Sequence, residues 1–196
     1  MKLAIFGGTF DPIHEAHLAI AREAADRFRL DRVLFIPAAH PPHKHGVTHA
    51  AYEHRVRMAE LACRADARFE VSRLEEGTAR SYSIDTIEKI RATLAPEDEL
   101  CFVIGADAFA EIRSWHRWRE VAHAVRFLVV SRPGHDYAVP PEARCDRIDS
   151  VDLPVSSSEI RRALAAGEQP RGLPPAVLDY ARAHALYRNQ PEVPPL

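Results

Sequence analysis

The sequence is poor in the features that mark secreted and membrane-spanning proteins. It has only three cysteines, Cys63, Cys101 and Cys145, which lie far apart and form no CxxC pair. Such an odd, scattered set is typical of a reducing cytoplasm and argues against a disulfide framework. No run of about 18 apolar residues is present to span a bilayer, and the segment before the first glycines is too short for a signal peptide. We therefore expect a soluble, cytoplasmic protein.

The chain also lacks an excess of charge of either sign. Its formal net charge is −2 with histidines neutral, which argues against a general nucleic-acid or membrane surface, so basic residues must act locally. With 196 residues, of which 46% are hydrophobic, the chain is long enough for one well-buried core and short for two. We expect one domain, residues 1–190, that contains a loop-rich insertion and is followed by a tail at 191–196.

Short apolar strands alternate with amphipathic helices. Strands are predicted at 2–6, 32–37, 69–72, 100–105 and 126–131, with a weaker one at 148–153. Helices are predicted at 15–28, 52–64, 83–94, 156–167 and 175–187. This alternation predicts an α/β fold, a Rossmann-like doubly wound parallel sheet with helices on both faces.

The loops that follow the strands hold most of the residues suited to chemistry. In a doubly wound sheet, ligands lie beyond the carboxyl ends of the strands, where the strand order reverses. These loops read GGTFDPIH (7–14), PAAHPPHK (37–44), GADAF (105–109), SRPGH (131–135) and PVSSS (154–158). We expect them to line one cleft.

The first of these loops, GGTFDPIHEAH at residues 7–17, predicts a phosphate site. Two glycines let the backbone turn with positive φ and let an anion approach the main chain. The helix that starts near Glu15 offers free N–H groups and a partial positive charge. His14 and His17, three residues apart, share one face of its first turn and are able to donate hydrogen bonds to phosphate oxygens.

Two other phosphate-binding motifs are missing. The G-x-G-x-x-G spacing of dinucleotide-binding folds is absent, and no acidic residue follows the second strand to hold a ribose. No GK[ST] follows the glycines, which excludes a Walker loop.

The turn resembles the signature GGTFDPxHxGH of the HxGH nucleotidyltransferase superfamily. The motifs SYSIDT (81–86) and GADAFAEIRSW (105–115), in that order, are most similar to the bacterial nicotinate-nucleotide adenylyltransferase family. The likeness runs from Lys2 to about Arg188 and departs from the family at Ala16, where glycine is usual. It implies transfer of the AMP part of ATP to nicotinate mononucleotide, with release of pyrophosphate. Mg²⁺ is expected to bridge the ATP phosphates because it prefers oxygen ligands.

The resemblance also implies roles for individual residues. His14 and His17 would be catalytic, and no side chain is assigned to a metal. Residues expected to bind ATP are Gly7, Gly8, Thr9, Phe10, Lys44, Asp107, Arg132, Ser156, Ser157 and Arg161. Residues expected to bind the nicotinate nucleotide are Asp11, Ser83, Thr86, Trp115 and His116, with main-chain amides at Thr86 and His116 meeting the carboxylate.

Several of these residues also fit simpler structural roles. The histidines of the loop 38–50 suggest zinc, although their spacing matches no common zinc pattern. Ser156 and Asp107 suit helix caps, and the tryptophans Trp115 and Trp118 suit core packing.

Two other functions remain open at this point. A sister enzyme such as a pantetheine-phosphate adenylyltransferase shares the signature turn, but its chain is shorter and lacks SYSIDT followed by the tryptophan segment. A nucleotide-binding module without catalysis would not need both histidines. The sequence is also compatible with a homo-oligomer.

Overall fold

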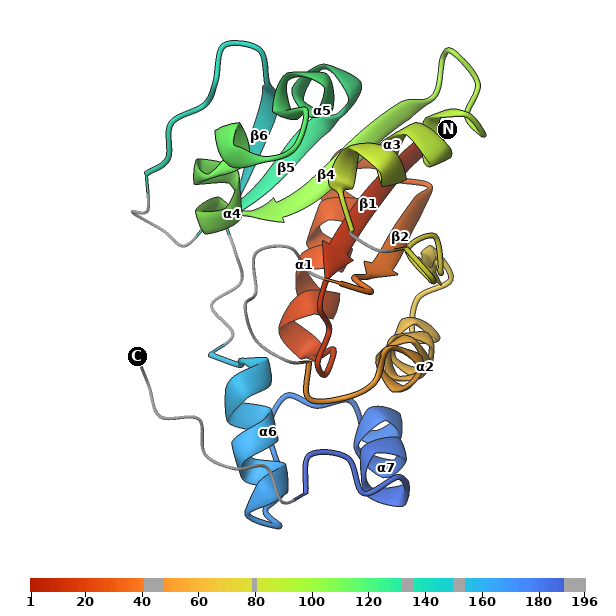
Figure 1. The fold of residues 1–196 in the computed structure, drawn as a ribbon, viewed down its shortest axis with the longest axis vertical. Helices are drawn as coiled ribbons and strands as arrows, with labels where there is room; N and C mark the ends of the chain where they lie inside the picture. Colours follow the sequence, from red (N-terminus) through yellow and green to blue (C-terminus); the bar gives the residue numbers. More distant parts are fainter. Residues whose placement is uncertain (41–47, 79–80, 132–135, 150–153, 189–196) are drawn as a thin grey trace.

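The computed structural model describes residues 1–40, 48–78, 81–131, 136–149 and 154–188, in which strands alternate with helices (Figure 1). The strands are β1 (Lys2–Gly8), β2 (Arg32–Pro37), β3 (Phe69–Val71), β4 (Glu99–Gly105), β5 (Arg126–Ser131) and β6 (Arg144–Asp149). The helices are α1 (Glu15–Phe28), α2 (Tyr52–Cys63), α3 (Ser83–Arg91), α4 (Ala106–Ala110), α5 (Trp118–Ala124), α6 (Ser157–Ala165) and α7 (Pro175–Ala183), with a 3₁₀ turn η1 (Ile112–Ser114).

The six strands form one sheet in the order β3-β2-β1-β4-β5-β6, and every neighbouring pair is parallel. The chain winds outward from β1 to β3, then returns to β4 on the other side of β1. The predicted doubly wound α/β fold is therefore confirmed. Its switch point lies between β1 and β4, and ligands of such sheets bind beyond the carboxyl ends of these strands.

Side chains that alternate along each strand build a core on both faces of the sheet. Ala4 and Phe6 of β1 pack in a cluster with residues of α1, α2, α6 and α7. Leu3 and Ile5 pack in the opposite cluster, with residues of α3, α4 and α5. A strand covered on both faces is apolar at every position, which is why these strands read as continuous apolar runs.

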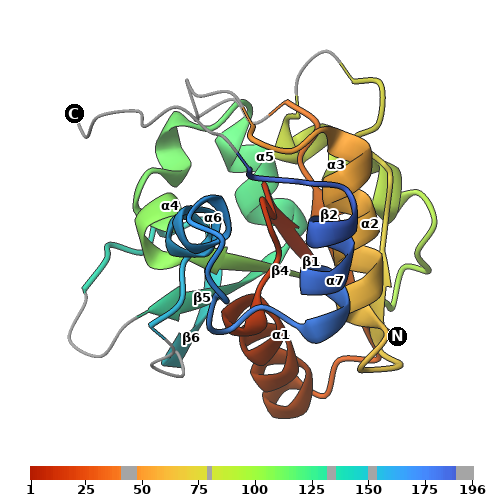
Figure 2. The same cartoon turned by 90° about the horizontal axis from the view of Figure 1, so that it is seen from below.

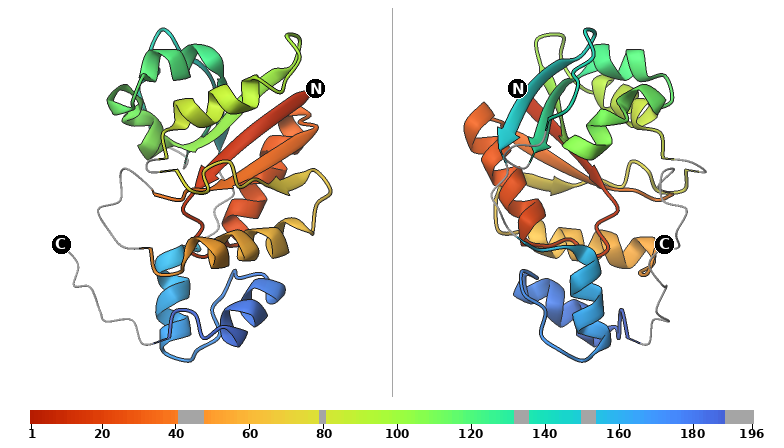
Figure 3. Two further views of the ribbon diagram at one scale, coloured as in Figure 1. Left: turned by 45° about the vertical axis from the view of Figure 1, so that its right-hand side comes forward. Right: turned by 90° about the vertical axis from the view of Figure 1, so that its left-hand side faces the viewer.

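Helices α6 and α7 occupy the end of the molecule toward which the strands point. Figure 3 shows them at the end opposite α5, and Figure 2 shows α7 beside α2. Ile160 of α6 and Val177 of α7 are buried in the same cluster as α1 and α2. The C-terminal helices therefore close one side of the region beyond the carboxyl ends of the strands.

Some predicted boundaries were wrong. Strand β6 spans Arg144–Asp149 and so begins four residues before the predicted start. Its residues are mostly polar and show no apolar alternation, and its pairing with β5 sets its position. Helix α7 ends at Ala183 rather than 187, since Ala185 and Tyr187 adopt φ of 50° and 65°. The segment GADAF, predicted as a loop, forms α4 directly after β4.

The helices of the described segments include none that combines the length and apolar character needed to cross a membrane. The predicted tail, 191–196, lies outside the described residues.

Candidate active site

The turn after β1 differs from the prediction in its backbone. Among the described glycines, those with positive φ are Gly77, Gly167 and Gly172, so Gly7 and Gly8 do not turn the chain as predicted. The left-handed residue is Phe10, with φ of 47°. Its ring is buried, with ring centroids 5.7 Å from Phe6 and 5.1 Å from His17. This aromatic packing holds a backbone conformation that non-glycine residues rarely adopt.

Gly8 is needed for close approach rather than for φ. A Cβ at Gly8 would lie 2.8 Å from two carbon atoms of the Phe10 ring, which is too close for any real contact. At Gly7 the nearest atom to such a Cβ is in Phe102, at 4.0 Å, an ordinary contact. The Phe10 ring therefore leaves no room for a side chain at Gly8, whereas Gly7 has room for one.

Gly8→Ala is expected to lower the free energy of unfolding by ~1–3 kcal/mol, because the added methyl group overpacks against a buried ring. Gly7→Ala is the matched control and should change it by less than ~1 kcal/mol. Urea unfolding of both variants measures the difference. Equal effects at the two positions would show that Phe10 yields and that the close approach carries no cost.

His14 and His17 are brought together at the start of α1. His14 is the N-cap, and the two rings stack with centroids 3.8 Å apart. The main-chain N–H of His14 donates to Nδ1 of His17 at 3.2 Å. Because Nδ1 accepts, the proton of a neutral His17 ring is on Nε2. The fold thus fixes His17 as a hydrogen-bond donor through Nε2.

His14 is the more buried of the pair, with 6% of its surface exposed. Its Nδ1 has no hydrogen-bond partner within the described part of the chain. Burial lowers the pKa of His14 from 6.5 to about 4, because the imidazolium loses its hydration. His14 is therefore neutral near pH 7 in this structure, and an anion at the turn would favour its protonated form.

The buried neutral state of His14 predicts a pH dependence of stability. The unfolded chain takes up this proton below about pH 6.5, whereas the folded chain holds it off until about pH 4. The free energy of unfolding should therefore fall as the pH drops through this window, by up to ~3 kcal/mol. His14→Asn keeps a good N-cap and removes the titrating group. Unfolding of both proteins between pH 7 and 4 measures the effect; an unchanged slope in the variant would exclude His14 as its source.

The N–H groups at the start of α1 are less free than predicted. The amide of Glu15 donates to the carbonyl of Gly172 at 2.9 Å, and that of His17 donates to the carbonyl of His14 at 3.0 Å. Gly172 lies in the connection to α7, with φ of 71°. The C-terminal part of the chain therefore caps the helix that carries the two histidines.

The serine segment before α6 lies against the same turn. Ser156 is the N-cap of α6 and forms a capping box with Glu159, so the structural alternative for this residue holds. Ser157 Oγ donates to the carbonyl of Pro12 at 3.0 Å, and Arg161 Nη1 donates to the carbonyl of Asp11 at 2.8 Å. The structure thus brings Ser157 and Arg161 to the signature turn, and their contact with ATP stays a prediction.

Asp11 lies at the centre of a buried network rather than on an open surface. Its carboxylate accepts the amides of His49 and Ala50, at 2.7 and 3.1 Å. It also accepts a hydrogen bond from the hydroxyl of Tyr187 at 2.8 Å. Burial, and then the proximity of Asp11, raises the pKa of Tyr187. Sequence reasoning missed Tyr187, because an aromatic residue at the end of an apolar helix pattern reads as packing. The predicted nucleotide-binding role of Asp11 is untested.

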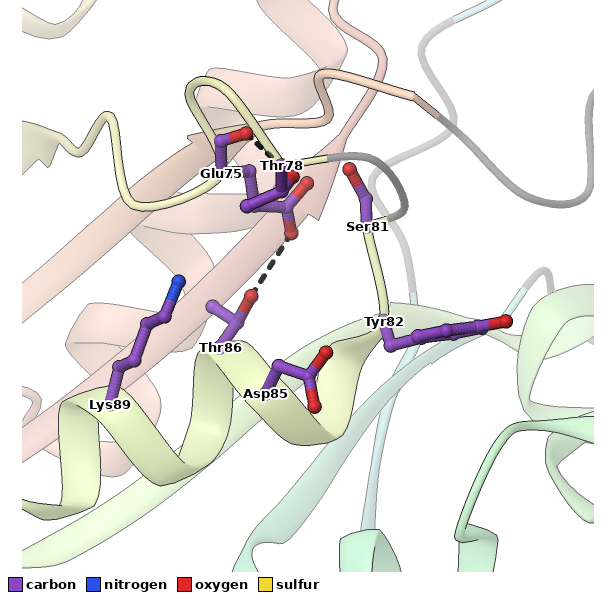
Figure 4. A pocket seen from close by; sticks show the side chains of 7 residues that line it. All are labelled: Glu75, Thr78, Ser81, Tyr82, Asp85, Thr86 and Lys89. Carbon is purple, nitrogen blue, oxygen red and sulfur yellow. Dashed lines mark hydrogen bonds between the residues drawn. The ribbon is translucent and has the colours of Figure 1, made fainter.

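A hollow with a volume of about 600 Å³ lies at the start of α3, and Figure 4 shows the side chains that line it. It is lined by Glu75, Thr78, Ser81, Tyr82, Asp85, Thr86 and Lys89. Figure 4 shows Glu75 and Thr86 pointing toward each other, and Thr86 Oγ1 donates to Glu75 Oε1 at 3.2 Å. Ser83 is the first residue of α3 and is half-buried. Glu75 and Lys89 were missed, since neither belongs to a motif that the sequence singles out.

The amide predicted to meet the nicotinate carboxylate is already in contact within the helix. The N–H of Thr86 reaches the carbonyl of Tyr82 at 3.4 Å, a long distance for such a bond. Hydrogen bonds also link the residues that line the hollow to the signature turn. The amide of His40, after β2, donates to Ser81 Oγ at 3.2 Å. Arg55 then joins this loop to the turn through the carbonyls of Ala38 and Thr9.

Trp115, predicted to stack on the acceptor ring, and the neighbouring His116 lie on the same face of the sheet as α3. Trp115 is half-buried and meets Phe102 edge-on at 6.0 Å, so part of its surface belongs to the core. His116 is exposed and lies over Tyr82, with ring centroids 4.5 Å apart. Tyr82 was not predicted as an aromatic partner of this segment.

The remaining predicted residues divide between the surface and the undescribed segments. Asp107 is exposed in the first turn of α4, directly after β4. Lys44 and Arg132 lie outside the described residues. In the described part of the chain no three or more His, Cys, Asp or Glu side chains gather as a metal site, so the zinc alternative gains no support there.

The comparisons with known proteins agree with this geometry. The Cytidylyltransferase-like family model matches residues 5–163. A probable nicotinate-nucleotide adenylyltransferase of Solibacter usitatus is 79% identical over 187 residues, covering 95% of this chain and all of that one. The chain belongs to the nicotinate-nucleotide adenylyltransferase family.

Two more distant proteins match almost the whole length of the chain. A probable nicotinate-nucleotide adenylyltransferase of Thermus thermophilus is 42% identical over 96% of this chain and 100% of its own. The Plasmodium falciparum nicotinic acid mononucleotide adenylyltransferase complexed with NaAD has a TM-score of 0.77 at 20% identity, over 95% of this chain and 97% of that one. At this identity the second likeness shows the fold alone.

Proposed function

We propose that this chain transfers the adenylyl group of ATP to nicotinate mononucleotide, giving nicotinate adenine dinucleotide and pyrophosphate. The observation that carries the proposal is the stacked His14–His17 pair at the start of α1, the first helix after β1. It lies at the β1–β4 switch point, and hydrogen-bonded loops connect it to the hollow at α3. Because the chain belongs to the family, with 79% identity to one member, we interpret this pair as catalytic.

ATP is proposed to bind beyond β1. The main chain of the glycine turn would hold the transferring phosphate together with His14 and His17, which supply donors on one face. The other residues proposed for ATP are those of the serine segment and its arginine, the aspartate after β4, and two cations in the undescribed loops: Ser156, Ser157, Arg161, Asp107, Lys44 and Arg132.

The acceptor nucleotide is proposed to bind at α3 and at the segment before α5. A carboxylate favours main-chain donors such as the amides of Thr86 and His116, and a flat pyridine ring favours the face of Trp115. Ser83, at the first position of α3, and Asp11, behind the turn, complete the proposed set.

The reaction needs positioning more than acid–base chemistry. The phosphate of the acceptor is already anionic, so it attacks the α-phosphorus of ATP in line, the bond to the bridging oxygen breaks, and pyrophosphate leaves with the electron pair. Holding the two polyanions in line supplies ~7–11 kcal/mol of the barrier reduction. The His17 ring donates through Nε2 to charge that develops at the phosphorus.

Mg²⁺ is the proposed metal, bound with the ATP phosphates. Oxygen ligands and retained waters suit this ion, and it would offset negative charge on the leaving pyrophosphate. In the described part of the chain, no three or more His, Cys, Asp or Glu side chains gather as a metal site.

A panel of acceptors tests the proposal. Wild-type protein is incubated with ATP, Mg²⁺ and either nicotinate mononucleotide, phosphopantetheine or no acceptor, and pyrophosphate is measured. Release that depends on nicotinate mononucleotide supports the function. Release with phosphopantetheine alone would favour the sister enzyme, and none with any acceptor would favour a binding module. We further propose a cytoplasmic location, in keeping with the free thiols of the described residues.

A further inference from the structure

One arginine is buried beneath the signature turn and belongs to no motif that the proposed function uses. Arg55, on α2, has 1% of its surface exposed. Its Nη1 donates to the carbonyls of Thr9 at 2.7 Å and Ala38 at 2.8 Å, and its Nε donates to that of Ala50 at 3.2 Å. A single side chain thus ties the turn after β1 to Ala38 and Ala50, which flank the undescribed segment after β2.

Burying a guanidinium is costly, so these contacts need a reason beyond packing. Burial lowers the pKa of Arg55, and the negative charge of Asp11 is the largest influence that opposes this shift. The carboxylate of Asp11 is already shared among two amides and the hydroxyl of Tyr187. The guanidinium thus offsets the negative charge of Asp11 beneath the turn, where an anion is proposed to bind.

Carbonyl oxygens repel anions. A turn that binds phosphate through its N–H groups therefore needs its carbonyl groups to point away from the phosphate and to accept hydrogen bonds elsewhere. Here three donors take up the carbonyls along the turn. Arg55 binds that of Thr9, Arg161 that of Asp11, and Ser157 that of Pro12. Of these three, only Arg55 is fully buried and reaches the stretch that is proposed to hold the α-phosphate.

We propose that Arg55 is a positioning residue for adenylyl transfer. It holds the carbonyl of Thr9 toward the protein, so that the amides of Thr9 and Phe10 face the phosphates. Its buried charge also raises the affinity of the turn for an anion. This inference rests on the proposed function, because the anion in question is the polyphosphate of ATP.

The test separates geometry from charge with two variants. Arg55→Ala removes both, and we expect kcat/KM for ATP to fall by ~10²-fold, the scale of a misplaced reacting group. Arg55→Lys keeps the charge but lacks the planar fork. It should therefore recover most of the affinity for Mg·pyrophosphate, measured by calorimetry, while kcat stays at least ~10-fold below wild type. The Kd of nicotinate mononucleotide should change less than twofold in both variants.

Arg91→Ala is the matched control. Arg91 also donates to main-chain carbonyls, those of Ala124 and Asp98, but it lies at the far end of α3. The Arg91→Ala variant should have a lower free energy of unfolding, with no change in kcat/KM for ATP or in the affinity for Mg·pyrophosphate. If the Arg55 variants alter ATP and acceptor binding equally, or match Arg91→Ala, Arg55 is merely structural and the inference is wrong. If Arg55→Ala does not fold, Arg55→Lys decides. Wild type that makes no dinucleotide would instead overturn the proposed function.

Discussion

His17→Ala is expected to lower kcat by ~10²–10³-fold, the scale of removing one preorganised donor to a charged transition state. The structure gives the donor a defined state, since Nδ1 of His17 accepts the amide of His14 and Nε2 therefore carries the proton. The ring is also packed edge-on against Phe10 at 5.1 Å, so the donor is held in place before the substrate binds. Single-turnover kinetics measure the chemical step.

The substitution also removes a helix cap, and two further variants separate this effect. His17→Gln retains a residue type that caps well at this position, so its stability should stay near that of wild type while its turnover falls. His123→Ala removes an exposed histidine at the end of α5 and should change neither the stability nor the turnover. A loss of less than tenfold in His17→Ala would show that the residue is not catalytic.

The second large effect concerns the acceptor. We expect kcat/KM to favour nicotinate mononucleotide over nicotinamide mononucleotide by at least ~10²-fold. Main-chain N–H groups that face both acceptor oxygens satisfy a carboxylate fully. An amide would turn its own NH₂ toward one of those donors and leave it unpaired, at a cost of ~1–3 kcal/mol, and would lose the charge-assisted bond as well.

His116→Ala tests where this preference arises. The proposed donors are main-chain groups, so most of the discrimination should remain in the variant. Its KM for the acceptor should rise, because the His116 ring lies over Tyr82 at the edge of the site. Side-by-side kinetics of both proteins with both nucleotides provide the measurement. Equal use of the two nucleotides by wild type would make the proposed acceptor site wrong.

The fold was predictable because its information is local. Continuous apolar strands such as 100–105 and the glycines after 2–6 reveal a parallel sheet and its first turn. Boundaries set by pairing were not predictable. Strand β6 has an arginine or aspartate at most positions and is fixed by its ladder to β5. Helix α7 ends where Ala185 adopts positive φ, which alanine does not signal.

The site was predictable in its residues and not in its connections. The spacing of His14 and His17 indicated a shared face, and the rings do stack. Glycine is needed at position 8 because a side chain there would collide with the ring of Phe10. The pattern of glycines in the sequence does not reveal this contact. Arg55 reads as one more basic residue on an amphipathic helix, since only the folded structure brings the carbonyl of Thr9 to it.

The stereochemistry at the α-phosphorus tests the central claim most directly, namely that the acceptor attacks ATP itself and the histidines only stabilise charge. Wild-type protein is given one diastereomer of ATP carrying sulfur on the α-phosphorus, with nicotinate mononucleotide as acceptor. The configuration of the dinucleotide formed is then read by ³¹P NMR. A single in-line displacement predicts inversion. Retention would mean two displacements through an adenylylated residue, with His14 or His17 as the nucleophile, and would contradict the account.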